Sequence, residues 1–326
     1  MTKACVVIPT KNESASIAAV IESVRKGFVG TRYDQIDILV VDDSYDDTRS
    51  VALQNGAVVV RGDGDGLGAA MYKGLKAALD FNPDVIVAVD GDGQADATTE
   101  IPRFLAPIDE HRADMVLGSR FMEPDLVDYH YRWVNRFGTR VLSWILRKQT
   151  GLTLTDSHGG IRAMIPAVAA DLELLGTHTY VQETIIDAVE KGYRLVEIPS
   201  VWLKRQTGKS RVVGSIPRYI FYTLPILILR SGAHIRYLYS AGIIFGLLSL
   251  LMFAIVVVQQ HSLSFAARTP SIVLVALLAT TGLQMFFFGF VLQLLKQLKK
   301  NVDRVGRRSS VILPDTPTNS SAQEDK

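Results

Sequence analysis

The chain has 326 residues, a length that suggests about two domains. Apolar residues make up 48% and charged residues 21%, with a mean hydropathy of +0.19, so a disordered chain is excluded and membrane segments are expected. The net charge of +2 does not indicate a nucleic-acid partner, and a single cysteine, Cys5, excludes an internal disulfide.

The first 200 residues alternate short apolar runs with stretches of helical spacing. The apolar runs are rich in Val and Ile, and Asp37 is the one charged residue within them. This pattern predicts an α/β fold whose mostly parallel sheet is covered by helices on both faces. The expected strands are 4–8, 36–41, 57–60, 85–89 and 115–118, and the expected helices are 14–24, 47–55 and 68–79.

Polar residues gather directly after four of these strands. In open α/β sheets, ligands bind in the crevice outside the carboxyl ends of the strands. Four polar clusters at four strand ends therefore predict an enzyme site at this edge of the sheet. The clusters are 9–13, 42–44, 90–94 and 118–120.

Asp90 and Asp92 stand two residues apart where the strand 85–89 ends, so both carboxylates can aim into one site. With the amide oxygen of Gln94, they supply the hard oxygen ligands that suit Mg²⁺ or Mn²⁺. A diphosphate would supply further oxygens. An isolated Asp-x-Asp is more often a solvated turn, but the preceding apolar strand favours the metal–diphosphate interpretation.

Two uncharged apolar runs, 237–258 and 271–295, are each long enough as a helix to cross a hydrocarbon core of about 30 Å. A pair of buried core helices is the competing interpretation, which the length of the runs disfavours. The link 259–270 joins the two runs into a hairpin, and Arg268 is the one Lys or Arg that it carries. Lys and Arg are plentiful on both flanks, so the positive-inside rule predicts an integral membrane protein with two spans and both termini in the cytoplasm.

The predicted organisation has four parts. An α/β catalytic domain covers 1–212, and an amphipathic juxtamembrane segment over 213–235 would lie in the membrane interface. The membrane hairpin covers 236–297. The remainder, 298–326, is a cytoplasmic tail that is basic at first and rich in Ser, Thr and Pro after Arg308, which predicts disorder.

Nine short motifs extend in order from residue 6 to residue 211. Each is weak alone, but together they are specific, and with them the chain resembles the family 2 glycosyltransferases of the GT-A type. The resemblance is strongest to the dolichyl- and polyprenyl-phosphate sugar synthases, such as dolichol-phosphate mannosyltransferase. The motifs are VVIPTKNE (6–13), VVDDSYDDT (40–48), GLGAA (66–70), VDGDGQ (89–94), GSRF (118–121), DSHGGIRA (156–163), QE (182–183), GYRLVEIP (192–199) and RQTGKSR (205–211).

This resemblance implies an inverting, metal-dependent transfer of a hexose from a GDP- or UDP-sugar to dolichyl or polyprenyl phosphate. The acceptor phosphate is already largely a dianion at neutral pH, so it needs little base catalysis. The implied donor-nucleotide residues are Pro9, Lys11, Glu13, Asp42, Asp43, Gly91 and Arg211. The implied metal ligands are Asp90, Asp92 and Gln94; the acceptor-phosphate residues are Arg120, Arg132 and Arg205; and the catalytic residues are Asp92 and Glu183.

The sequence departs from the family pattern at four places, which bear on nucleobase stacking and on the fit of the sugar or acceptor. They are Lys11 in place of an aromatic, Gly91 in place of Ala, His158-Gly159-Gly160 in place of a Gly-Phe pair, and Arg211 in place of Lys.

Several alternatives stay open at this point. A membrane glycosyltransferase with another lipid or a polysaccharide acceptor would share the same core, and a non-catalytic membrane scaffold would retain the fold. A dinucleotide dehydrogenase is disfavoured, because the first strand is followed by Pro-Thr-Lys-Asn-Glu and lacks the glycine pattern. The two apolar helices would also allow a homo-oligomer to form through them. The sugar and the nucleotide are not specified by these motifs.

Overall fold

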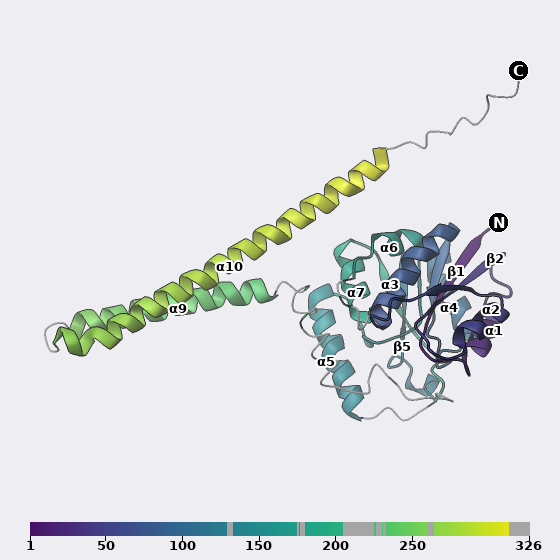
Figure 1. Cartoon of the computed structure of the whole chain (residues 1–326), viewed down its shortest axis with the longest axis horizontal. Coiled ribbons are helices and arrows are strands. Elements are labelled where there is room, and N and C mark those ends of the chain that lie inside the picture. The colour runs from purple at the N-terminus through teal and green to yellow at the C-terminus, as the bar shows by residue number, and fades with distance from the viewer. Residues whose placement is uncertain are drawn as a thin grey trace, which may run out of the picture. The chain divides into compact units, whose positions relative to one another are not determined.

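The computed structural model describes residues 1–128, 133–174, 176, 180–204, 225, 230, 233–259 and 264–312. The chain divides into two compact units, Met1–Arg230 and Ser231–Lys326 (Figure 1). Of the predicted juxtamembrane segment 213–235, most residues lie outside the described part of the chain.

A seven-stranded sheet forms the centre of the first unit. Its strand order is β3-β2-β1-β4-β6-β5-β7, and β6 runs antiparallel to its neighbours β4 and β5, while the other pairs are parallel. The mostly parallel sheet is thus confirmed, and all five predicted strands are present. The strands are β1 (Lys3–Thr10), β2 (Gln35–Asp42), β3 (Val58–Arg61), β4 (Val85–Ala88), β5 (Met115–Ser119), β6 (Arg162–Met164) and β7 (Leu195–Pro199).

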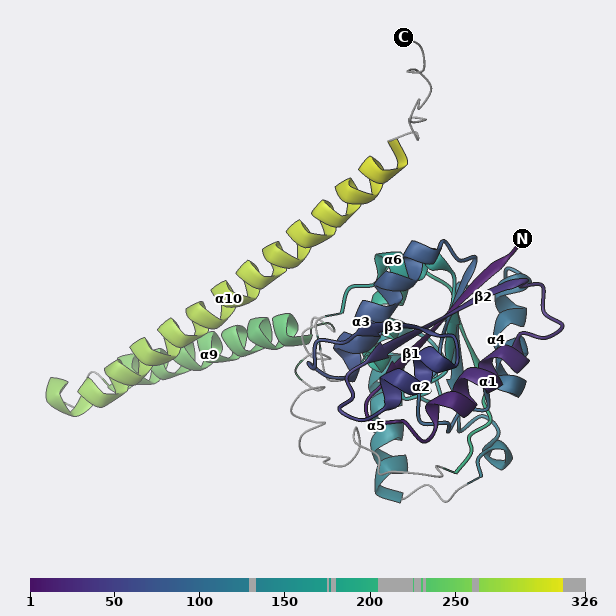
Figure 2. The same ribbon diagram turned by 45° about the vertical axis from the view of Figure 1, so that its right-hand side comes forward.

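Two hydrophobic cores lie on the two faces of this sheet, because successive side chains of a strand point to opposite faces. In β4, Val85 and Val87 face one core, whereas Ile86 and Ala88 face the other. The first core is covered by α1 (Ile17–Gly27), α2 (Thr48–Gln54) and α4 (Ala97–Asp109), as Figure 2 shows. The second is covered by α3 (Leu67–Ala78), α5 (Trp133–Thr150), α6 (Pro166–Asp171) and α7 (Val181–Glu190).

The register of the sheet brings the polar strand ends together. Thr10 pairs with Asp42 across β1 and β2, and Val7 pairs with Ala88 across β1 and β4. Since these three strands are parallel, the loops that follow them leave from the same edge. This edge is where the sequence predicted an enzyme site.

The second unit contains two packed helices, α9 (Ala233–Val258) and α10 (Phe265–Ile312). Their contacts pair early residues of α9 with late residues of α10, so the helices are antiparallel. A Cβ atom at Gly242 would lie 2.9 Å from the carbonyl oxygen of Gly282, whereas Ser249 Oγ donates to the Val275 carbonyl at 3.0 Å. Glycine at the crossing lets the two backbones approach closely, which is typical of helices that pack in a membrane.

Residues His234–Val258 and Ala267–Leu298 are long and apolar enough to cross a membrane. They include both predicted spans. The predicted link was too long, because α10 begins at Phe265, ahead of Pro270. Ser264 starts the helix by accepting the amide of Ala267 at 3.4 Å, and Pro270 lies inside the helix, in its second turn. α10 also continues to Ile312, so the start of the tail predicted after Arg308 is helical.

Candidate active site

The ends of β1 and β2 are joined by side-chain hydrogen bonds around Asp42. Thr10 Oγ1 donates to Asp42 Oδ1 at 2.9 Å, and the amide of Ser44 donates to the same oxygen at 3.2 Å. Asp42 is buried, so these donors offset the cost of removing its carboxylate from water. The predicted nucleotide residue Asp42 is therefore held in one orientation at the edge of the sheet.

Asp43 turns toward the loop that follows β3. Its Oδ1 accepts from the amide of Gly64 at 2.9 Å, and a Cβ atom at Gly62 would lie 2.2 Å from that oxygen. On the other side, Lys11 Nζ lies 6.0 Å from the centre of the Tyr45 ring, which is exposed. Tyr45 thus places an aromatic ring beside Lys11, where the family pattern has an aromatic at position 11 itself.

The ends of β1 and β4 pack closely at Gly91. A Cβ atom there would lie 2.8 Å from Thr10 Cγ2 and 3.1 Å from the Pro9 carbonyl oxygen. Ser16 Oγ donates to the Gly91 carbonyl at 2.8 Å and lies 3.4 Å from Glu13 Oε2. Six of the seven predicted donor-nucleotide residues therefore belong to one surface built from the ends of β1, β2 and β4. The seventh, Arg211, lies outside the described residues.

The Asp-x-Asp pair follows β4 directly. Asp92 Oδ1 accepts the amide of Gln94 at 3.1 Å, which fixes the turn that carries the three predicted metal ligands. Gln94 is tied in turn to the chain after β7, because its carbonyl accepts from the amide of Leu203 at 2.8 Å. Among the described residues, no group of three or more His, Cys, Asp or Glu side chains is arranged so that it could hold a metal ion by itself. Two carboxylates and an amide would fit a hard divalent cation whose remaining ligands would come from a diphosphate.

A glycine pair closes over Asp90 from the loop before β6. A Cβ atom at Gly160 would lie 2.0 Å from Asp90 Oδ2, and one at Gly159 would lie 1.9 Å from the Gly118 carbonyl oxygen. A side chain at Gly159 would collide with backbone, and one at Gly160 would displace the Asp90 carboxylate or the loop. The departure from the family pattern at 158–160 therefore allows this loop to lie directly against the ends of β4 and β5.

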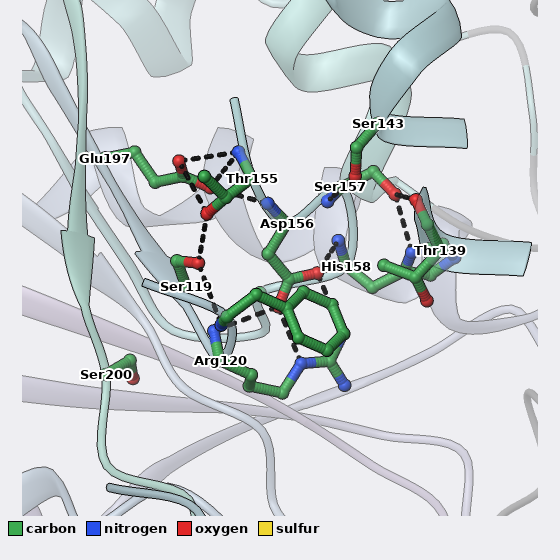
Figure 3. A network of polar contacts seen from close by, with 12 residues as sticks. Ser119, Arg120, Thr139, Ser143, Thr155, Asp156, Ser157, His158, Glu197 and Ser200 are labelled. Atoms are coloured by element: carbon green, nitrogen blue, oxygen red, sulfur yellow. Dashed lines mark hydrogen bonds and ion pairs between the residues drawn. The ribbon is translucent and has the colours of Figure 1, made fainter. Parts of the chain in front are cut away.

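Arg120, at the end of β5, forms a bidentate ion pair with Asp156 (Figure 3). Arg120 Nε lies 2.6 Å from Asp156 Oδ2, and Nη2 lies 2.9 Å from Oδ1. Both side chains are buried, and the Arg120 guanidinium lies 4.9 Å from the centre of the Trp202 ring. Burial by itself would raise the pKa of Asp156, but the charge of Arg120 and its hydrogen bonds hold that pKa below its usual range.

The neighbours of Asp156 are fixed by further polar contacts in the same view (Figure 3). The Glu197 carboxylate of β7 accepts from the amides of Thr155 and Asp156, at 2.8 and 2.7 Å respectively. His158 Nδ1 lies 2.7 Å from Ser157 Oγ. Burial, reinforced by the charge of Arg120, lowers the pKa of His158 to about 4, so its ring is neutral at pH 7.

A buried arginine, Arg162, donates hydrogen bonds to the loop that carries the glycine pair. Arg162 Nε donates to the Gly159 carbonyl at 3.4 Å, and its Nη1 donates to Thr184 Oγ1 of α7. The Tyr180 hydroxyl donates to the Gly160 carbonyl at 3.2 Å. The centre of the Tyr180 ring lies 5.2 Å from the Arg162 guanidinium carbon. Burial lowers the pKa of Arg162, and the nearby carboxylates of Asp90 and Asp156 act against this effect.

Glu183 lies on α7 in a buried ionic cluster. Its Oε1 accepts from the amide of Gly176 at 2.8 Å, and its Oε2 lies 3.5 Å from Arg230 Nε. Arg230 Nη1 also lies 2.6 Å from Asp187, which in turn binds Lys191 at 2.8 Å. The catalytic role assigned to Glu183 stays a prediction, and the structure supplies Arg230 as its cationic partner.

Two predicted acceptor residues, Arg132 and Arg205, lie outside the described residues. Sequence reasoning gave no role to Asp156, Arg162 or Trp202, which the structure places around Asp90 and Arg120. Asp156 and Arg162 lie within the motif 156–163, and that motif was the available signal. Trp202 lies between the motifs 192–199 and 205–211, so no motif pointed to it.

The sequence model described as glycosyl transferase family 2 matches residues 5–171, and the chain belongs to this family. It is therefore a glycosyltransferase. An uncharacterised glycosyltransferase of Mycobacterium tuberculosis is 34% identical over 65% of this chain and 90% of its own length. Two further relatives are an undecaprenyl-phosphate mannosyltransferase of Micrococcus luteus and a polyprenol monophosphomannose synthase of Mycolicibacterium smegmatis. The Micrococcus luteus protein is 30% identical over 64% of this chain and 87% of its own length. The Mycolicibacterium smegmatis protein is 29% identical over 64% of this chain and 81% of its own length.

Solved structures agree with the GT-A fold. A glucosyl-3-phosphoglycerate synthase of Mycobacterium tuberculosis, in complex with Mn²⁺, UDP-glucose and phosphoglyceric acid, matches with a TM-score of 0.55. The match covers 71% of this chain and 80% of that chain at 22% identity. At this identity the likeness establishes the fold and carries no statement about the substrate.

Proposed function

We propose that the protein transfers a hexose from a nucleotide-diphospho-sugar to a polyprenyl-type lipid phosphate, with inversion at the anomeric carbon. One observation carries this proposal: the candidate residues Asp90, Asp92 and Arg120 follow β4 and β5 at one sheet edge of a family 2 glycosyltransferase that also has two helices long and apolar enough to cross a membrane. The names of the two polyprenyl-phosphate mannosyltransferase relatives support the same acceptor class.

The donor nucleotide would lie along the ends of β1 and β2. Asp42 is oriented by Thr10 and Ser44 to accept from hydroxyl or base N–H groups, and Tyr45 offers an exposed ring for stacking. Gly91 keeps the floor between β1 and β4 free of side chains. The chain's own residues thereby hold the nucleoside with its diphosphate directed toward Asp90 and Asp92.

Asp90, Asp92 and Gln94 would hold Mg²⁺ or Mn²⁺ together with the donor diphosphate. When bound, the cation would stabilise the negative charge that develops on the departing diphosphate. Gly160 supports this assignment, because the absence of a Cβ atom there leaves room for the Asp90 carboxylate. The fixed turn at Asp92 and Gln94 keeps these oxygens oriented before the substrate arrives.

The acceptor phosphate would meet Arg120, which Asp156 orients and Trp202 flanks. Asp156 takes the Nε and Nη2 donors and holds the guanidinium in one orientation, and guanidinium N–H groups suit phosphate oxygens. Arg132 and Arg205 remain further candidates for the same phosphate. Because the nucleophile already carries charge, the protein's work is to align the phosphate with the anomeric carbon and to exclude water.

We also propose that α9 and α10 cross the membrane and that the glycosyltransferase unit and both termini are cytoplasmic. The excess of Lys and Arg outside the hairpin supports this topology. It would give the site access to both soluble nucleotide sugars and lipid phosphates.

The function is tested with purified full-length protein in lipid, polyprenyl phosphate and a panel of radiolabelled nucleotide sugars. One donor should give an organic-soluble product that mild acid hydrolyses. Asp92→Asn should abolish this product and remove stimulation by Mg²⁺ or Mn²⁺. A product that forms at the same rate in Asp92→Asn and in the presence of chelator would contradict the metal assignment.

A further inference from the structure

Arg162 is the largest fully buried side chain among the described residues, and the proposed transfer gives its charge no role. Its contacts are with neutral groups. Nε and Nη2 both donate to the Gly159 carbonyl at 3.4 Å, and Nη1 donates to the Thr184 hydroxyl. The guanidinium carbon lies 5.2 Å from the centre of the Tyr180 ring. In the described part of the chain, no ion pair joins Arg162 to a carboxylate.

This arrangement sets Arg162 apart from the other buried arginines. Arg120 and Arg230 each lie 2.6 Å from a carboxylate oxygen, of Asp156 and Asp187 respectively. A guanidinium is always charged at neutral pH, and burying a charge without a partner is costly. The charge of Arg162 is therefore balanced by carboxylates at longer range, while neutral hydrogen bonds hold the side chain in place.

The sheet places this charge next to the strand end that carries Asp90. Arg162, in β6, pairs with Ala88 of β4 on one side and with Leu117 of β5 on the other. The loop that Arg162 holds also lies against Asp90, since a Cβ atom at Gly160 would be 2.0 Å from Asp90 Oδ2. Burial lowers the pKa of Arg162, and Asp90 is among the groups that act against this effect. Arg162 is thus a fixed positive charge beside the candidate metal-binding turn.

The charges around this turn have a simple balance. Among the described residues, the carboxylates of Asp90, Asp92 and Asp156 face the guanidiniums of Arg120 and Arg162, which leaves one negative charge in excess. A bare divalent cation would give this group a net positive charge. A cation in complex with a nucleoside diphosphate would not, because the phosphate oxygens neutralise the ion. Like charges a few ångströms apart repel measurably even at an effective dielectric constant of about 20.

We propose that Arg162 is a positioning residue whose buried charge weakens binding of a bare divalent cation at Asp90 and Asp92, so that the cation enters as its complex with the donor diphosphate. This inference rests on the metal role that the proposed function gives to these two carboxylates. Arg162 acts through the loop at Gly159 and through its charge, and it does not touch the ligand. Loading of the cation and arrival of the donor would then be one event.

The test measures Mn²⁺ binding to the full-length protein in nanodiscs of zwitterionic lipid, from the electron paramagnetic resonance signal of free Mn²⁺. Arg162→Gln removes the charge and keeps an N–H donor for the Gly159 carbonyl. Without nucleotide, this variant should bind Mn²⁺ at least about fivefold more tightly than wild type, because a repelling charge is gone. Calorimetric titration with UDP and with GDP at saturating Mn²⁺ should show no such gain. A purely structural role predicts the opposite sign, since a loosened loop would weaken binding of the bare ion as well.

Two control variants separate the charge from the packing. Tyr180→Phe removes the hydrogen bond to the Gly160 carbonyl and leaves the charge of Arg162 in place, so it should not tighten binding of bare Mn²⁺. Arg25→Met, at an exposed position on α1, removes one positive charge far along the chain and should change neither titration. Unchanged binding of bare Mn²⁺ by Arg162→Gln would overturn the inference. An equal gain for Mn²⁺ with nucleotide would overturn it too.

Thermal unfolding gives a second readout that does not require Arg162→Gln to be fully folded. Loss of the guanidinium leaves Asp90 without its balancing charge, so Arg162→Gln should unfold at a lower temperature than wild type. Asp90→Asn in the same chain should recover part of this loss, and no recovery would overturn the charge balance. Asp92→Asn checks the proposed function separately: unchanged nucleotide-dependent Mn²⁺ binding would remove the metal site and this inference with it. A missing lipid product would leave both measurements standing, because neither uses the acceptor.

Discussion

Gly160 and Asp90 are in direct contact: a Cβ atom added to Gly160 would lie 2.0 Å from Asp90 Oδ2. Gly160→Ala must therefore displace the carboxylate that follows β4 or the loop before β6. We expect transfer activity to fall at least about tenfold, with weaker metal-dependent binding of the nucleotide diphosphate, since a displacement of about 1 Å costs catalysis heavily. Enzyme assays and calorimetric titration of the nucleotide measure both effects.

Gly138→Ala is the matched control, because a Cβ atom there meets nothing within 4 Å and the position lies in a helix. It should leave activity intact and keep or slightly raise stability. Equal activity of Gly160→Ala and wild type would show that Asp90 is not used as proposed.

Glu183 offers a test that separates a catalytic role from a structural one. Its carboxylate is buried with Arg230 and Asp187, and removing one partner of a buried ion pair leaves the others uncompensated. Glu183→Gln and Arg230→Gln should each lower the free energy of unfolding by about 3 kcal/mol. Urea unfolding of each variant and of the double variant measures this, and the double variant should lose less than the sum.

If Glu183→Gln kept its stability and lost only turnover, the catalytic assignment from the sequence would stand and the structural one would not.

The strands and the Asp-x-Asp turn were predictable because they are encoded locally. Runs rich in Val and Ile give β1, β2 and β4, and the polar residues that end them fall at one edge once the strands are parallel. β6 was not predictable, since it has three residues and inserts antiparallel between β4 and β5 through pairing distant in sequence. The pair Arg120–Asp156 spans 36 residues, and Glu183 meets Arg230 from still farther away. Such partners depend on tertiary packing that no local pattern records.

His158 predicts a pH dependence of stability. Its pKa falls from 6.5 to about 4 in the folded protein because of burial and the charges of Arg120 and Arg162, which Asp156 offsets only in part. Between these two values the unfolded chain binds more protons than the folded one, so stability should decrease as the pH falls through this window. Thermal unfolding from pH 7 to pH 4.5 should show a smaller decrease for His158→Gln than for wild type. Identical slopes would mean that His158 titrates normally in the fold.

The membrane topology can be tested by cysteine labelling without removing the native thiol. Burial, with a smaller contribution from Asp37, raises the pKa of Cys5 to about 12. Because only the thiolate form reacts, maleimides should leave this buried thiol unmodified in the folded protein. Ser264→Cys, in the link before α10, should react with an impermeant maleimide from the non-cytoplasmic side. Ser320→Cys should react from the cytoplasmic side. The reverse pattern would place the site away from cytoplasmic nucleotide sugars.

The acceptor is the central claim, and competition between two acceptors tests it most directly. Full-length protein in nanodiscs is given one labelled nucleotide sugar that it hydrolyses or transfers, together with equal concentrations of polyprenyl phosphate and 3-phosphoglycerate. We predict that the label enters the organic phase as an acid-labile lipid product and that Arg120→Ala removes it. Label recovered in water-soluble glycosylated phosphoglycerate, with none in the lipid, would contradict the lipid-phosphate assignment.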